Sequence, residues 1–136
     1  MKTKPDYGEF MDPECIPLCD ALNSIRGITT KESCCGHGKN SFHVWLLASF
    51  PRALFVVGRA ISRPFAGFES RWTCNLFTWD VRACPVEFML TSNGVKGEQA
   101  DMEAELISFN IRNILANEPL RKRFSLREAE EWAKQL

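Results

Sequence analysis

The hydrophobic pattern changes its period at Gly27 and again at Pro51, and these switches limit the possible folds more than any other feature. Residues 18–25 place apolar side chains at helical spacing. Residues 28–34 alternate and are rich in Thr, and residues 41–49 form a run of apolar and aromatic side chains. Because such runs are typical of strands, the first part of the chain is predicted to fold as helix, strand, strand, helix. Residues 33–40 are predicted to form the exposed end of an antiparallel hairpin between the two strands.

Prolines and glycines predict where these elements begin and end. The first helix opens at Asp12-Pro13 or at Cys15-Ile16-Pro17, since Pro is tolerated in a first turn, and Gly27 is suited to its end. A second helix begins near Pro51 and stops at Pro64. Its predicted core face consists of Phe50, Leu54, Val57 and Ile61.

The second half of the chain repeats the change from strand to helix. Residues 71–91 are rich in aromatic and β-branched side chains and predict two or three strands, broken near Asp80 and at Cys84-Pro85. Residues 98–117 predict a long amphipathic helix, and the capping-box sequence at residues 125–128 predicts a last helix. The inward face of the long helix is predicted to contain Ala100, Ala104, Ile107, Ile111 and Leu115.

This order of elements predicts an α+β fold: an antiparallel sheet of about 4–5 strands with helices packed mainly on one face. The 136 residues suit a single domain over residues 1–136, in which residues 1–11 are polar and expected to be loose. Hydrophobic residues make up 45% of the chain, enough for a sizeable core. A disordered or multidomain protein is therefore not expected.

Charge and segment patterns exclude several classes of partner. Lys+Arg and Asp+Glu both number 17, and this balance argues against binding of duplex nucleic acid. No apolar run reaches the ~18 residues of a spanning helix, and the N-terminus lacks the apolar core of a secretory signal. We therefore expect a cytoplasmic protein with no membrane contact, for which a homo-oligomer is compatible with the sequence.

The chain contains six cysteines and no CxxC pair. In a reducing compartment they are expected to be mostly free and buried, without disulfides. Cys15 and Cys19 would share one helix face, a spacing poorly suited to a bridge.

The most unusual segment combines two thiols, an imidazole, two glycines and an ammonium group. Its residues are Ser33, Cys34, Cys35, Gly36, His37, Gly38 and Lys39. Glycines let a loop present its backbone N–H groups to an anion, and Lys39 adds positive charge. With His43 on the following strand, and Trp72 or Trp79 stacking beside it, this loop is predicted to hold a small anionic, nucleotide-like ligand.

Other interpretations of this loop stay open. The glycines could serve only a hairpin turn, and at least one of Cys34 and Cys35 could serve packing. A metal site, with zinc as the ion, could draw on Cys35, His37, His43 and Cys74, but the usual two-residue spacers are missing, so no metal is predicted. A nucleophilic cysteine paired with His37 or His43 would make the protein an enzyme instead, with its catalytic residues unknown.

A second set of basic and aromatic residues could also hold nucleotides. It consists of Arg52, Arg59, Arg63, Arg71, Trp72 and Trp79. The alternative is a solvated helix face over a tryptophan-rich core.

The segment from Asp20 to Thr30, followed by Glu32 to Lys39, resembles small phage and prophage proteins of unknown function. The resemblance covers about residues 12–47 and continues faintly through Trp72 and the residues from Gly94 to Leu115. It implies no settled activity, although small phage proteins that sequester nucleotide signals of host defence suggest an anti-defence binding role.

A weaker likeness is to the tRNA wybutosine-synthesising protein 3 family, whose members are methyltransferases acting on a modified tRNA base. Ser33, Cys34 and Gly36 match that family's Ser-Ser-Cys-Ser-Gly-Arg loop, whereas Cys35 replaces a Ser and His37 replaces the Arg. This chain is also much shorter. The expected function is therefore a binding protein, with a methyltransferase-like or cysteine-dependent enzyme and a protein–protein inhibitor or accessory factor as alternatives.

Overall fold

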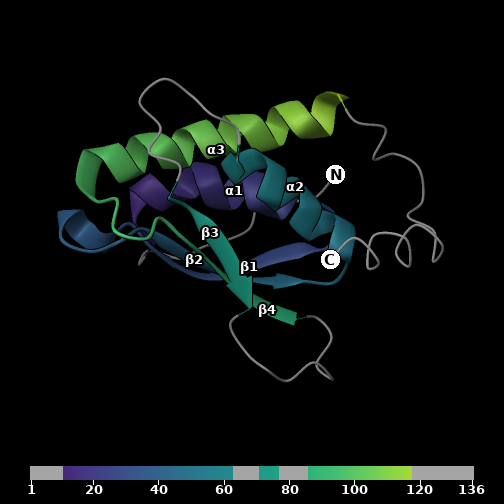
Figure 1. Ribbon diagram of the computed structural model, residues 1–136, viewed down its shortest axis with the longest axis horizontal. Helices are drawn as coiled ribbons and strands as arrows, with labels where there is room; N and C mark the ends of the chain where they lie inside the picture. The colour runs from purple at the N-terminus through teal and green to yellow at the C-terminus, as the bar shows by residue number, and fades with distance from the viewer. Residues whose placement is uncertain (1–10, 63–70, 77–85, 118–136) are drawn as a thin grey trace.

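The computed structural model describes residues 11–62, 71–76 and 86–117 (Figure 1). Its elements, in chain order, are η1 Pro13–Cys15, α1 Ile16–Ser24, β1 Ile28–Cys34, η2 Gly36–Gly38, β2 His43–Ala48, α2 Pro51–Ser62, β3 Thr73–Leu76, β4 Val86–Thr91 and α3 Gly97–Asn117. The predicted succession of helices and strands is confirmed over these ranges.

The four strands form one antiparallel sheet in the order β1-β2-β4-β3. The helices α1, α2 and α3 lie on one side of it (Figure 1), as the α+β prediction requires. Side chains of β2 alternate between the helix-covered face and the opposite face: Val44, Leu46 and Ala48 are buried, whereas His43 and Trp45 are half-buried. The core therefore lies between the sheet and the helices.

The turn between α1 and β1 is held by local contacts. Gly27 has a φ of +93°, the left-handed region that glycine adopts freely. The Asn23 amide donates to Thr30 Oγ1 at 2.8 Å, and its oxygen accepts from the Thr30 backbone N–H at 2.9 Å. These bonds fix α1 against the edge strand, and so fix where the segment preceding α1 runs.

Two packing predictions need correction or completion. In α2 the buried side chains are Ala53, Val56, Val57 and Ala60. Leu54 and Ile61 are only partly buried and Phe50 is 42% exposed, so the prediction was right for Val57 and wrong for Phe50. In α3, Ala100, Ala104, Ile107 and Ile111 are buried as predicted, and Leu115 packs at the margin beside buried Ile114. Small residues face inward on α2 because it packs closely against both α3 and the sheet.

Several predicted features lie outside the described residues: residues 1–10, Arg63, Trp79, the break near Asp80, Cys84-Pro85 and the helix at residues 125–136. Met11, the one described member of the expected loose segment, packs against the core. No helix in the described ranges is both long enough and apolar enough to cross a membrane.

Candidate functional site

The loop from Cys35 to Phe42 connects β1 and β2 at one end of the sheet. Cys34 pairs with His43, and His43 pairs with Thr91, so β1 ends, β2 begins and β4 ends at the same place. The predicted antiparallel hairpin is confirmed. The prediction that its end at residues 33–40 is exposed is wrong for Cys35 and Gly36, which are buried.

Three successive residues of the loop have positive φ angles: Gly36 (82°), His37 (52°) and Gly38 (77°). Two features require glycine at position 36. Its φ is positive, and a Cβ there would lie 3.0 Å from the Ser41 carbonyl oxygen. Gly36 O accepts from both Lys39 N and Asn40 N at 3.0 Å. The loop is thus a tightly closed turn that holds His37 in a left-handed conformation.

Three backbone N–H groups of the loop, those of Cys35, Gly36 and His37, already have partners within the protein. Cys35 N donates to Asp12 Oδ2 at 3.0 Å. Gly36 N donates to Cys34 Sγ at 3.3 Å, and His37 N donates to Cys35 Sγ at 3.4 Å. The carboxylate of Asp12 therefore accepts the first of these donors, and a ligand at this loop must contact other groups.

Asp12, Cys35 and His37 form a compact cluster of three different ligand types. His37 Nε2 lies 3.7 Å from Asp12 Oδ2, and His37 Nδ1 lies 3.9 Å from Cys35 Sγ. One ligand atom from each residue falls within 4.8 Å of the others. The His37 side chain is 68% exposed and that of Asp12 20%, whereas Cys35 is 7% exposed. The cluster thus stands at the surface with its thiol on the inner side.

The electrostatics of the cluster separate its carboxylate from its thiol. The hydrogen bond from the Cys35 backbone N–H holds the pKa of Asp12 below its usual value. Burial raises the pKa of Cys35, and the neighbouring Asp12 carboxylate adds to the shift. Although the imidazole stands between thiol and carboxylate as in a nucleophile–base–acid arrangement, a nucleophilic cysteine needs a lowered pKa. The raised pKa of Cys35 disfavours its use as a nucleophile at neutral pH.

Further carboxylates lie near Asp12. Burial raises the pKa of Asp101, and the negative charges of Glu14, Glu105, Glu98 and Asp12 raise it further. Asp101 Oδ1 is buried, and within the described part of the chain it accepts no hydrogen bond. Carboxylates from η1 and the first turns of α3 therefore face one another next to the loop.

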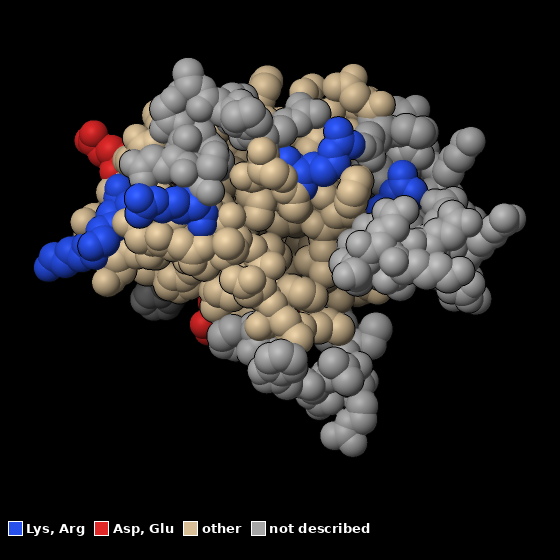
Figure 2. All heavy atoms as spheres, viewed as in Figure 1, with Lys and Arg blue, Asp and Glu red and all other residues tan. Residues whose placement is uncertain are grey.

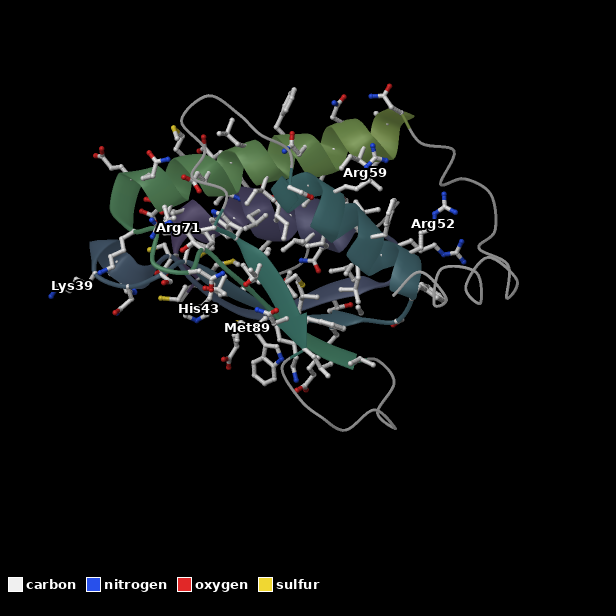
Figure 3. The ribbon with its side chains drawn as sticks, in the orientation of Figure 1. Lys39, His43, Arg52, Arg59, Arg71 and Met89 are labelled. Carbon is white, nitrogen blue, oxygen red and sulfur yellow. The ribbon has the colours of Figure 1, made fainter. Side chains whose placement is uncertain are left out.

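A basic edge lies on the same loop. A Cβ on Gly97, the first residue of α3, would lie 3.9 Å from Gly38 Cα, so the helix begins against the loop. Lys39 and Lys96, which flank this contact in sequence, are both exposed. Figure 2 shows basic side chains gathered at this end of the molecule, where Figure 3 labels Lys39 and Arg71. Arg52 and Arg59 lie on α2, far from Lys39 (Figure 3), so the predicted arginine set is divided.

Of the remaining predicted site residues, Cys34 borders the cluster, and Ser33, His43 and Cys74 lie outside it. The half-buried Cys34 thiol donates a hydrogen bond to Asp12 and helps to lower the pKa of that carboxylate. Ser33 lies in β1 against the thiols of Cys15 and Cys19. His43 points to the side of the sheet away from the helices, as Met89 does (Figure 3). Cys74 is in β3, so neither His43 nor Cys74 joins Cys35 and His37 as the metal hypothesis supposed.

Trp72 belongs to the core. It is 4% exposed, its ring centroid lies 5.5 Å from that of Phe42, and its Nε1–H donates to Glu103 Oε1 at 2.9 Å. Its ring faces are therefore closed to a ligand beside the loop, and the stacking role predicted for Trp72 is wrong. Trp79, the other predicted stacking residue, lies outside the described residues.

The other described thiols are free and shielded. Burial raises the pKa of Cys15 to about 12, that of Cys19 to about 11 and that of Cys74 to about 12. These thiols stay protonated at neutral pH, which suits a packing role.

Sequence reasoning missed Asp12, Lys96 and Asp101 as parts of the site. Asp12 could have been singled out because it lies at the predicted opening of the first helix, but nothing in its spacing connects it to Cys35, 23 residues later.

Comparisons of the chain with protein-family models, curated proteins and solved structures found no match. The functional conclusion therefore rests on the geometry.

Proposed function

We propose that the protein is a non-enzymatic binding protein for a small anionic, nucleotide-like ligand, held at the loop of residues 33–39. The observation that carries the proposal is the contact between Gly38 and Gly97, which brings the start of a 21-residue helix against the loop. The first turn of a helix has N–H groups without intrahelical partners and a partial positive charge, and both favour anions.

The exposed lysines Lys39 and Lys96 flank this helix start, and the exposed ring of His37 lies on the same loop. A phosphate or carboxylate group at this edge would be reached by ammonium groups from two separate segments. The carboxylates of Asp12, Glu98 and Asp101 lie near this helix start and disfavour an anion, so the proposal depends on the two ammonium groups. The basic edge is therefore the proposed contact surface.

The test is calorimetry against inorganic phosphate, mononucleotides and cyclic nucleotides, with a chelator present to exclude metal ions. Lys39→Ala and Lys96→Ala should each weaken binding by about 5–30-fold, the equivalent of roughly 1–2 kcal/mol for a charge-assisted hydrogen bond. Lys31→Ala is the matched control, because Lys31 is an exposed lysine whose Nζ lies over the Trp45 ring instead.

Preference for a nucleotide over phosphate would support the nucleotide-like ligand. The proposal is wrong if no member of the panel binds, or if both lysine variants bind as tightly as Lys31→Ala. Turnover of a bound nucleotide would instead support the enzyme hypothesis.

A further inference from the structure

We propose that Asp12, Cys35 and His37 bind one Zn²⁺ ion. This site lies on the same loop as the basic edge but does not use Lys39 or Lys96, so it would stand even if no anion binds there. Carboxylate oxygen, thiolate sulfur and imidazole nitrogen are the three ligand types that zinc takes in proteins, and soft sulfur favours zinc over magnesium or calcium.

The spacing of the three side chains suits a tetrahedral ion. Metal–ligand bonds of about 2.0–2.3 Å place the ligand atoms of a tetrahedral zinc site roughly 3.3–3.8 Å apart. One ligand atom from each residue lies within 4.8 Å of the others. The 3.7 Å to Asp12 Oδ2 and the 3.9 Å to Cys35 Sγ are measured to the two different nitrogens of the His37 ring, so a small rotation of this ring is needed to close the site. Since one imidazole gives one nitrogen to an ion, the exposed ring of His37 turns toward it while the two inner side chains keep their places.

Hydrogen bonds already orient two of the ligands. The backbone N–H of Cys35 donates to Asp12 Oδ2, and the other lone pairs of this carboxylate stay available to an ion. The backbone N–H of His37 donates to Cys35 Sγ, and this bond favours the thiolate form. Binding converts the Cys35 S–H into a thiolate and releases its proton to solvent. Three protein ligands leave a fourth position open to water or to an added anionic group.

The negative charge of the nearby carboxylates is a second observation that supports a cation site. Asp101 holds a buried carboxylate oxygen that accepts no hydrogen bond within the described ranges, and it lies among the negative charges of Asp12, Glu14, Glu98 and Glu105. A divalent cation at Asp12 would reduce the mutual repulsion of these carboxylates. The same field disfavours an anion at this position.

The experiment titrates the full, reduced and metal-stripped chain with Zn²⁺ in competition with a chromophoric chelator. One equivalent should bind. The chain contains two histidines, which provide a matched pair of variants. Loss of a group that only supports a metal ligand weakens metal binding by roughly 10–100-fold, and His37→Gln should weaken Zn²⁺ binding by more than this. His43→Gln should bind Zn²⁺ like the wild type. Cys35→Ser and Cys74→Ser form a second pair with the same expected contrast, because Cys74 lies in β3 outside the cluster.

Two further measurements separate ligation from misfolding. Asp12→Asn keeps an oxygen that can accept the Cys35 N–H, so it should weaken Zn²⁺ binding while circular dichroism stays unchanged. Co²⁺ should give a thiolate charge-transfer band that Cys35→Ser abolishes and Cys74→Ser retains. Zn²⁺ should raise the melting temperature of the wild type but not of His37→Gln. The inference is overturned if His37→Gln binds as tightly as His43→Gln, or if Co²⁺ gives no thiolate band. Phosphate binding in the presence of chelator is a separate readout, so the two proposals can fail independently.

Discussion

Two polar junctions lie at the same end of the sheet, and they use their hydrogen-bonding groups differently. At the first, Ser92 is fully buried: its Oγ accepts from Phe42 N at 2.8 Å and donates to Val95 O at 2.7 Å, while its N–H donates to Phe42 O at 2.9 Å. At the second, Asp12 and His37 reach the surface, where His37 Nε2 lies 3.7 Å from Asp12 Oδ2.

The comparison separates a structural polar group from a candidate ligand. A buried hydroxyl with both a donor and an acceptor contributes to stability and has no hydrogen left for a partner outside the protein. A partly exposed carboxylate, thiol and imidazole have lone pairs in excess of the donors around them. Stability and binding should therefore respond to different substitutions, and the predictions below test this, from the largest effect to the smallest.

Gly36→Val should have the largest effect on stability. The left-handed φ and the contact of its Cβ with Ser41 O should together lower the free energy of unfolding by about 2–4 kcal/mol, measured by urea denaturation. Gly38→Val is the matched control: its φ is also positive, but its Cβ would meet no atom within 4 Å. Its cost should be only the backbone strain, about 1–2 kcal/mol. Equal costs at both positions would show that the Ser41 contact is unimportant.

Ser92→Ala should destabilise the fold without affecting Zn²⁺ binding. The Phe42 N–H would lose its acceptor in the core, at a cost of about 1–3 kcal/mol by urea denaturation. Ser24→Ala is the control, because the Ser24 hydroxyl donates to the Ala21 carbonyl at an exposed position. This substitution should change the free energy of unfolding by less than about 0.5 kcal/mol. A weakened Zn²⁺ affinity in Ser92→Ala would contradict the separation of the two junctions.

Asp12→Ala should both destabilise the protein and abolish Zn²⁺ binding. The Cys35 N–H loses its acceptor, at about 1–2 kcal/mol. Because the folded-state pKa of Asp12 is lowered, its contribution is present above the unfolded pKa and is lost as the pH falls through the folded value. Urea denaturation at several pH values should show that the difference in free energy of unfolding between wild type and Asp12→Ala becomes smaller as the pH falls. A gap that does not depend on pH would show that the ionised carboxylate is not the stabilising form.

Asp101→Asn should have the smallest effect and the opposite sign. The raised pKa of Asp101 means that its ionised form destabilises the fold at neutral pH, so the amide should stabilise the metal-free protein by less than about 1 kcal/mol. Thermal unfolding at neutral and acidic pH checks this, since the advantage of Asn should vanish as Asp101 becomes protonated. A destabilised variant at neutral pH would contradict the repulsion between carboxylates, and with it one support for the zinc site.

The sequence by itself determined the local elements of this protein. The change of period at Gly27, the alternation of residues 28–34 and the apolar spacing of α3 predicted helices and strands that the structure contains. These predictions succeed because periodicity depends on neighbours within a few residues. The pair formed by β1 and β2 also followed, since two strands joined by a short glycine-rich loop favour an antiparallel hairpin.

Only the tertiary structure decided which side chains meet. The packing of α1 on β1 brings Asp12 to the Cys35 N–H, and the start of α3 comes against Gly38 because all three helices share one face of the sheet. The same packing encloses Trp72 beside Phe42 and turns His43 to the opposite face. No local pattern encodes these contacts, because residues far apart in the chain meet only after the helices and the sheet have buried their apolar surfaces together.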